Sequence, residues 1–176
     1  DLRDVGEHQR RRGIGAFIDH SDPLTICIGM LYYSLNKKTP PVSFREATIE
    51  GQAPDKGLYF PESIPQLNAD FFTGIERLED REIAFRVMRP YTTGSLSDDA
   101  LRSIVDETIN FPIPLVSITP DISTLELFHG PTLAFKDVGA RFMSRCLGTF
   151  LEGSGKKVTV LVATSGDTGG AVADGF

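Results

Sequence analysis

The sequence lacks the features that mark a membrane or exported protein. No window approaches the roughly 20 apolar residues that a membrane-spanning helix needs. The longest apolar stretch, residues 24–31, is short and is closely preceded by acidic residues. No clean apolar segment follows the early positive charges either, so the sequence predicts no signal peptide. We therefore expect no membrane partner.

Cysteine and histidine are scarce. The two cysteines, Cys27 and Cys146, lie far apart, so no disulfide framework is predicted. The three histidines are widely separated along the chain, so no metal site is predicted. With two thiols and no export signal, a reduced, cytoplasmic location is the default expectation.

A shortage of basic residues excludes another class of partner. The chain has 18 Lys and Arg against 24 Asp and Glu, a net charge of −6 and a pI near 5.0. Nucleic acid requires a basic face, and the one basic run, Arg10, Arg11 and Arg12, is too short to supply it. Nucleotide motifs are missing too: Gly-x-Gly-x-x-Gly does not occur, and Phe150 stands where a Walker motif needs its first glycine.

What the chain does have is the patterning of an α/β protein. Residues 1–29 show no sustained period, and we interpret them as an extension, from added sequence or an upstream start, ahead of Met30. The region 30–110 is predicted to be mainly helical. The region 111–176 alternates strand, loop and helix, which predicts the start of a domain with an open, mostly parallel sheet and flanking helices. Because the chain stops hardly two turns into its last predicted helix, we expect this domain to be incomplete at the C-terminus.

Local signals predict the individual elements. Ser43 and Glu46 form a capping box for a helix that ends near Gly51, and Ser97 begins another helix. Further helices are predicted at 80–89, 137–151 and from 171, and strands at 31–35, 57–61, 115–118, 124–128 and 157–163. The last strand is apolar and β-branched, which is typical of a strand buried on both faces.

The loop at residues 164–170 is one of two that carry candidate chemistry. Its glycines and hydroxyl side chains follow a predicted strand and enter a helix whose first N–H groups have no partners. Such a helix start favours a carboxylate or a phosphate. The alternative is a tight turn that binds no ligand.

The earlier loop, residues 129–136, ends at Lys136. Gly-Pro fixes a turn, and residues 133–135 form an apolar collar ahead of the lysine. A cation at a helix start opposes the helix dipole and is partly desolvated, conditions that favour the neutral amine of a nucleophile. Alternatively, Lys136 is an ordinary lysine whose stem packs on Phe135 and whose ammonium meets solvent or Asp137.

Together, the two loops resemble the threonine synthase family. Residues 127–137, Leu-Phe-His-Gly-Pro-Thr-Leu-Ala-Phe-Lys-Asp, are similar to that family's cofactor-lysine segment, and residues 163–171, Ala-Thr-Ser-Gly-Asp-Thr-Gly-Gly-Ala, to its second motif. Their separation fits one helix and one strand, as that fold requires. Stretches around residues 33, 43 and 57–61 also agree, so the resemblance covers 30–176 and leaves 1–29 unexplained.

The resemblance implies a pyridoxal 5'-phosphate (PLP) enzyme of fold type II that converts O-phospho-L-homoserine and water to L-threonine and phosphate. It implies that Lys136 binds PLP and then moves protons on the substrate. The resemblance also implies that Asp167 lies at the cofactor, where related PLP enzymes carry an asparagine that donates to the ring oxygen. A carboxylate donates only when protonated, so another role is expected for Asp167. The residues implied to hold the substrate's α-carboxylate are Thr164, Ser165, Gly166 and Thr168.

Two other functions stay open at this stage. One is a related PLP phospholyase acting on another amino acid, and the other is a non-catalytic α/β module. The family's PLP phosphate loop comes later in the sequence than this chain extends, so the isolated chain is expected to be inactive. The family suggests a monomer, with a dimer as the alternative.

Overall fold

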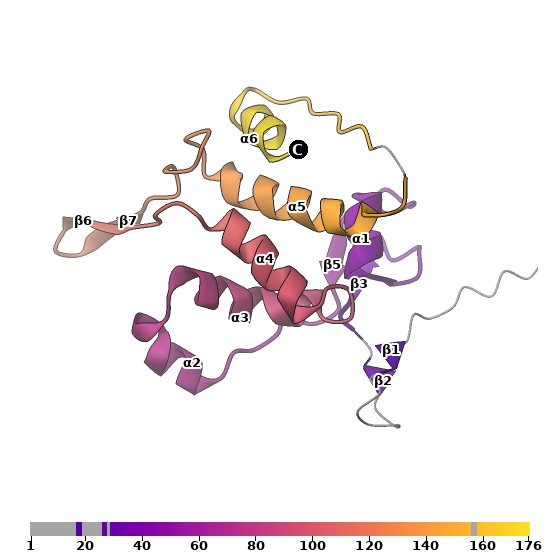
Figure 1. Ribbon diagram of the computed structural model, residues 1–176, viewed down its shortest axis with the longest axis horizontal. Helices are drawn as coiled ribbons and strands as arrows, with labels where there is room; N and C mark the ends of the chain where they lie inside the picture. Colours follow the sequence, from indigo (N-terminus) through magenta and orange to yellow (C-terminus); the bar gives the residue numbers. More distant parts are fainter. Residues whose placement is uncertain (1–16, 19–25, 28, 156–157) are drawn as a thin grey trace, which may run out of the picture.

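The structure is a computed structural model that describes residues 17–18, 26–27, 29–155 and 158–176. These residues form an α/β chain in which long helices lie between small peripheral sheets (Figure 1). The strands are β1 (Phe17–Ile18), β2 (Ile26–Cys27), β3 (Leu31–Ser34), β4 (Val42–Ser43), β5 (Tyr59–Pro61), β6 (Leu115–Thr119) and β7 (Ile122–Leu125). The helices are α1 (Phe44–Glu50), α2 (Ala69–Gly74), the 3-10 turn η1 (Ile75–Arg77), α3 (Asp80–Thr92), α4 (Asp98–Thr108), α5 (Lys136–Leu151) and α6 (Asp167–Gly175).

Every strand pair in the described residues is antiparallel. β3 lies between β4 and β5, β1 pairs with β2, and β6 pairs with β7 as a hairpin. The predicted open, mostly parallel sheet is therefore not confirmed, although the α/β class is. Strands joined by short turns pair antiparallel, whereas parallel pairing requires a longer crossover between the partners.

Helix capping follows the sequence signals closely. The Ser43 hydroxyl accepts a hydrogen bond from the Glu46 N–H at 3.2 Å, and the Glu46 carboxylate accepts one from the Ser43 N–H at 2.9 Å. This confirms the predicted capping box. Gly51 ends the helix with φ +68°, a conformation that glycine adopts without strain. Ser97 caps α4 in the predicted way, by accepting from the Ala100 N–H.

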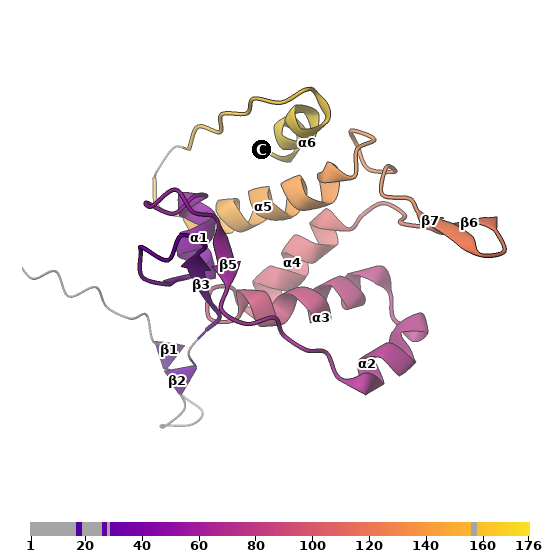
Figure 2. The ribbon, with the colours of Figure 1, turned by 180° about the vertical axis from the view of Figure 1, so that it is seen from behind.

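The core lies where α3, α4 and α5 pack together, an arrangement visible from both sides of the molecule (Figures 1 and 2). Leu101, only 1% exposed, packs with Phe85 and Val105. A second cluster joins Ile104 of α4 to the far end of α5. Phe142 of α5 contacts both clusters, so the helix that begins at Lys136 is fastened to the rest of the core.

The prediction of a strand at residues 157–163, the most apolar of the predicted strands, is wrong. Residues 158–163 belong to no strand, and Leu161 is 90% exposed; residue 157 lies outside the described residues. A strand buried on both faces needs neighbouring strands to pair with, and none of the described strands pairs with this segment.

Several predicted boundaries also shift. The last helix begins at Asp167 and not at Ala171, the predicted helix at 80–89 continues to Thr92, and the strand expected at 124–128 is β7, at Ile122–Leu125. The strand predicted at 57–61 is confined to Tyr59–Pro61. Within the described part of the chain, no helix is long and apolar enough to cross a membrane.

Candidate active site at the starts of two packed helices

The loop that leads into α5 is closed by a buried carboxylate. Asp137 is fully buried, and its Oδ2 accepts a hydrogen bond from the Thr132 N–H at 2.9 Å while its Oδ1 accepts one from the Thr132 hydroxyl. Gly130 approaches the same carboxylate so closely that an added Cβ would lie 2.5 Å from Oδ2. Leu133 takes φ +59°, which is rare for a branched side chain. The loop is thus ordered and locally strained.

Lys136 is the first residue of α5 and is half-buried. Its Nζ lies 5.2 Å from the centroid of the Phe135 ring. No carboxylate among the described residues lies within ion-pair distance of this ammonium group. The packing on Phe135 matches one half of the ordinary-lysine interpretation, while the pairing with Asp137 is not found, because that carboxylate is occupied by Thr132.

The predicted apolar collar is only partly confirmed. Ala134 is buried, but Leu133 and Phe135 are 74% and 62% exposed. Lys136 is therefore half-buried and borders one aromatic ring, that of Phe135.

The loop that leads into α6 is organised by Thr164. Its Oγ1 accepts hydrogen bonds from the N–H groups of Gly166, at 3.1 Å, and Gly169, at 2.9 Å. The Thr164 hydroxyl oxygen therefore accepts hydrogen bonds inside the loop, while the N-cap position of α6 is Gly166. An added Cβ on Gly169 would lie 2.9 Å from this oxygen, so the close approach requires glycine.

Two N–H groups at the start of α6 remain available. Within the described residues, the N–H groups of Asp167 and Thr168 have no hydrogen-bond partner. Ser165, Gly166 and Asp167 are exposed, and Thr168 is half-buried. The helix terminus thus keeps bare donors and the positive end of its dipole facing solvent, as an anion site requires.

The two helices that carry these loops pack against each other (Figures 1 and 2). Arg141 of α5 lies 3.3 Å from the Asp174 carboxylate of α6, and Arg145 donates to the Gly175 carbonyl at 3.0 Å. Arg141 also donates to the Glu107 carbonyl of α4 at 2.7 Å. The packing places the Lys136 loop and residues 164–168 at the starts of neighbouring helices, although no hydrogen bond or ion pair between described residues joins the two loops.

Sequence reasoning missed two contacts in the first loop. One is the Asp137–Thr132 pair. The other joins Glu126 Oε2 to His129 Nε2 at 2.7 Å, beside the Phe128 ring. A Glu and a His three residues apart could have suggested this contact. The spacing brings the two side chains together only if the chain turns between them, which the sequence did not show.

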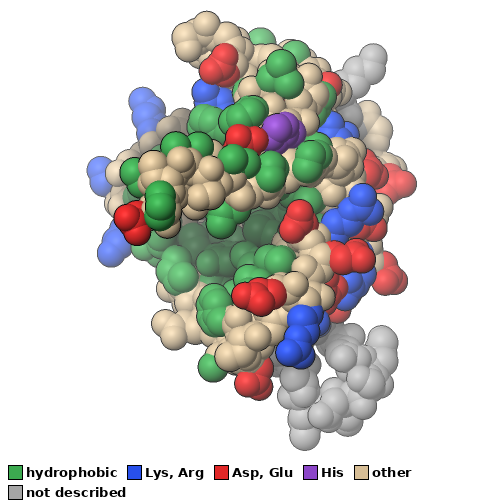
Figure 3. All heavy atoms as spheres, turned by 90° about the vertical axis from the view of Figure 1, so that its left-hand side faces the viewer, with side chains coloured by type: hydrophobic (Ala, Val, Ile, Leu, Met, Phe, Trp, Pro, Cys, Tyr) green, Lys and Arg blue, Asp and Glu red, His purple; other side chains and the backbone are tan. Residues whose placement is uncertain are grey.

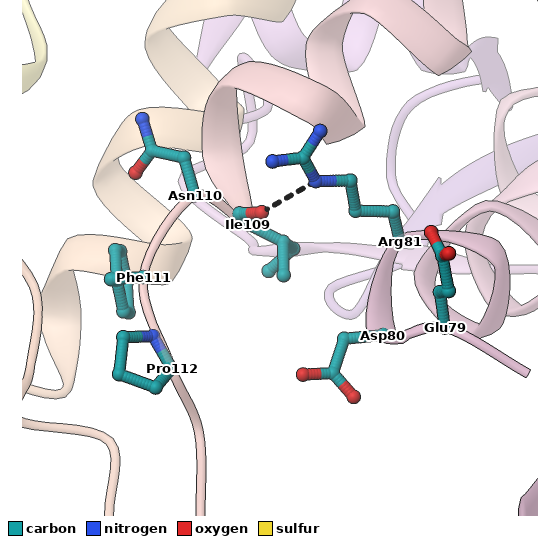
Figure 4. A pocket seen from close by; sticks show the side chains of 7 residues that line it. All are labelled: Glu79, Asp80, Arg81, Ile109, Asn110, Phe111 and Pro112. Carbon is teal, nitrogen blue, oxygen red and sulfur yellow. Dashed lines mark hydrogen bonds between the residues drawn. The ribbon is translucent and has the colours of Figure 1, made fainter.

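Three other features are alternative candidates for a site: the Cys146 thiol, a metal-binding cluster and the pocket beside Arg81. None of them forms a site among the described residues. Burial raises the pKa of the Cys146 thiol to about 12, so it is not a nucleophile near neutral pH. No group of His, Cys, Asp and Glu in the described residues could hold a metal ion. A pocket of about 300 Å³ lies beside Arg81, but its guanidinium already donates to the Ile109 carbonyl (Figure 4), and none of the predicted site residues lines it. We therefore place the candidate site at the two loops.

By architecture, the chain is an α/β protein that presents a lysine amine and bare helix N–H groups at the starts of two packed helices. The family model described as "Threonine synthase N terminus" matches residues 31–109. Threonine synthase from Pseudomonas aeruginosa is 38% identical over 151 residues, which cover 83% of this chain and 32% of that protein. The enzyme from Haemophilus influenzae is 42% identical over 147 residues, covering 84% of this chain and 34% of that protein.

A solved structure agrees with the sequence relatives. The crystal structure of PLP-bound threonine synthase from Brucella melitensis superposes with a TM-score of 0.79 at 37% identity, covering 84% of this chain and 33% of that one. The chain is therefore similar to threonine synthases over most of its length, and it spans about a third of the length of the curated relatives it matches.

Proposed function

We propose that the full-length protein is a threonine synthase, which converts O-phospho-L-homoserine and water to L-threonine and phosphate with PLP, and that Lys136 holds this cofactor. The observation that carries the proposal is the environment of Lys136. It stands in an ordered loop at a helix start, its amine has no carboxylate partner among the described residues, and it belongs to a chain that matches threonine synthases.

The residues present fit an aldehyde cofactor. The Lys136 amine is not held by any carboxylate of the described residues, lies 5.2 Å from the centroid of the Phe135 ring and is half-buried, so an aldehyde can approach it. PLP, when bound, withdraws electrons from the substrate carbon next to the amino group. Lys136 would add and remove protons at the substrate's carbon atoms as the phosphate departs and water adds.

The start of α6 would hold the substrate's α-carboxylate. Its free N–H groups, at Asp167 and Thr168, face solvent at the positive end of the helix dipole. The supporting residues are Thr164, Ser165, Gly166 and Thr168. Asp167 would lie at the cofactor, but its carboxylate accepts hydrogen bonds, so its role is to orient neighbouring donors.

The wider organisation is part of the same proposal. Residues 30–110 would form the N-terminal, mainly helical region, which the match over 31–109 supports, and 111–176 the start of the PLP-binding α/β domain after a 1–29 extension.

Exposed apolar residues of the β6–β7 hairpin border a hollow (Figure 3); they are Leu115, Ile118, Ile122 and Leu125. An uncovered face of this kind supports the view that this chain alone is inactive. We place the full-length enzyme in the cytoplasm as a monomer.

Substrate turnover by the full-length protein tests the proposed function. We expect release of inorganic phosphate from O-phosphohomoserine together with threonine formation, and much slower turnover of O-phosphoserine. Preferred turnover of O-phosphoserine would instead indicate a related PLP phospholyase. Failure to take up PLP at all would contradict both and favour a non-catalytic module.

The role of Thr164 gives a second prediction. Thr164→Val removes the hydroxyl that fixes Gly166 and Gly169, so the helix start should loosen and the KM for O-phosphohomoserine should rise about tenfold, from the loss of roughly 1–2 kcal/mol. Thr164→Ser is the matched control, because it keeps the hydroxyl. Steady-state kinetics checks this prediction, and equal KM values for the two variants would contradict it.

A further inference from the structure

The buried carboxylate of Asp137 has no role in the chemistry proposed above. It is fully buried at the residue next to Lys136. Burial of a charge is costly unless the charge is hydrogen-bonded or paired. Among the described residues, no cation lies within ion-pair distance of this carboxylate, and its side-chain hydrogen bonds go to Thr132. The Asp137 carboxylate therefore stabilises the conformation of the loop that contains Thr132.

Those contacts tie the middle of the loop to the first turn of α5. Thr132 donates to Asp137 from both its backbone N–H and its hydroxyl. Inside the ring of residues 132–137, Asp137 N–H donates to the Ala134 carbonyl at 3.0 Å, and Leu133 N–H donates to the Gly130 carbonyl, just before the ring, at 3.1 Å. The carboxylate thus closes the turn from Ala134 to Asp137, and Lys136 is the last residue inside the ring.

The same carboxylate holds a conformation that the chain would not choose alone. Leu133 has φ +59°, a region that disfavours branched side chains. Gly130 lies so close to Oδ2 that only glycine fits. A strained turn persists only when its surroundings fix it, and here the fixing group is Asp137.

We propose that Asp137 is a positioning residue, which acts through Thr132 to hold the Lys136 amine where an aldehyde can reach it. The inference rests on the proposed function, in which the Lys136 nitrogen forms a C=N bond with the aldehyde carbon and the aldehyde oxygen leaves as water with two amine protons. The backbone of Lys136 is fixed from both sides, by the closed loop and by α5. Release of the loop would let the amine explore unproductive directions.

The test compares Thr132→Val, which removes the hydroxyl at nearly constant shape, with Thr132→Ser, which keeps it. Both are made in the full-length protein, together with Asp137→Asn. The PLP-free protein is mixed with PLP, and condensation at Lys136 is followed by visible absorbance and by borohydride trapping, per folded molecule. We expect about a tenfold slower condensation for Thr132→Val and Asp137→Asn, and a rate within about twofold of wild type for Thr132→Ser.

The outcomes separate this inference from the proposed function. If the wild-type protein is not labelled at Lys136, the proposed function itself is wrong. If it is labelled and both Thr132→Val and Asp137→Asn condense at the wild-type rate, the positioning role is overturned, even if their melting temperatures fall. If both variants fail to fold, Asp137 is a structural residue only, which also overturns the inference.

Discussion

Lys136→Ala is expected to lower the kcat of the full-length protein for phosphate release from O-phosphohomoserine by about a thousandfold or more, because in the proposed function its amine is both nucleophile and proton carrier. The visible absorbance of the cofactor joined to the protein should disappear in the same variant. The helix itself should remain, since the Lys136 side chain makes no hydrogen bond or ion pair to the described residues and contacts the ring of Phe135.

Lys56→Ala is the matched control. Lys56 is exposed and lies in the turn before β5, outside the two loops of the candidate site. Its removal should leave kcat within about twofold of wild type, as expected for a surface change away from the site. A Lys136→Ala enzyme that kept most of its activity would remove Lys136 from the chemistry.

Leu101→Ala should produce the largest loss of stability. Leu101 is 1% exposed and packs between α3 and α4 against residues that also contact Phe142 of α5. Truncation removes buried methyl groups and leaves a cavity, so the free energy of opening for the amides of α4 should fall by about 2–5 kcal/mol. Native-state hydrogen exchange on the full-length protein measures this quantity for each element.

An exposed leucine supplies the comparison. Leu35 is 52% exposed, and Leu35→Ala should change the free energy of opening by less than about 0.5 kcal/mol. Similar effects for the two leucines would mean that α3, α4 and α5 do not form the core described above. A weakened core should also slow condensation at Lys136, because α5 begins at that residue.

Features fixed by neighbours in sequence were predictable. The capping box of Ser43 and Glu46 joins residues three apart, and Ser97 caps its helix in the same local way. The start of the long helix after the Lys136 loop was predicted to within one residue. For the two capped helices the hydrogen-bonding partners lie within one turn, so the sequence alone identifies them.

Features that depend on distant partners were not predictable. Residues 158–163 have the composition of a buried strand, but a strand forms only where another strand pairs with it. The Asp137–Thr132 pair also escaped prediction, because it requires the strained backbone at Leu133 to fold the loop back on itself. Exposure of Leu133 and Phe135 follows from the same fold, and therefore the apolar collar was overestimated.

The central claim is that the amine of Lys136 condenses with the cofactor. Borohydride reduction of the full-length protein with PLP, followed by peptide mapping, tests it most directly. The account predicts one stable pyridoxyl label, on the peptide that contains Lys136. A label on a different lysine, or no label at all, would contradict it.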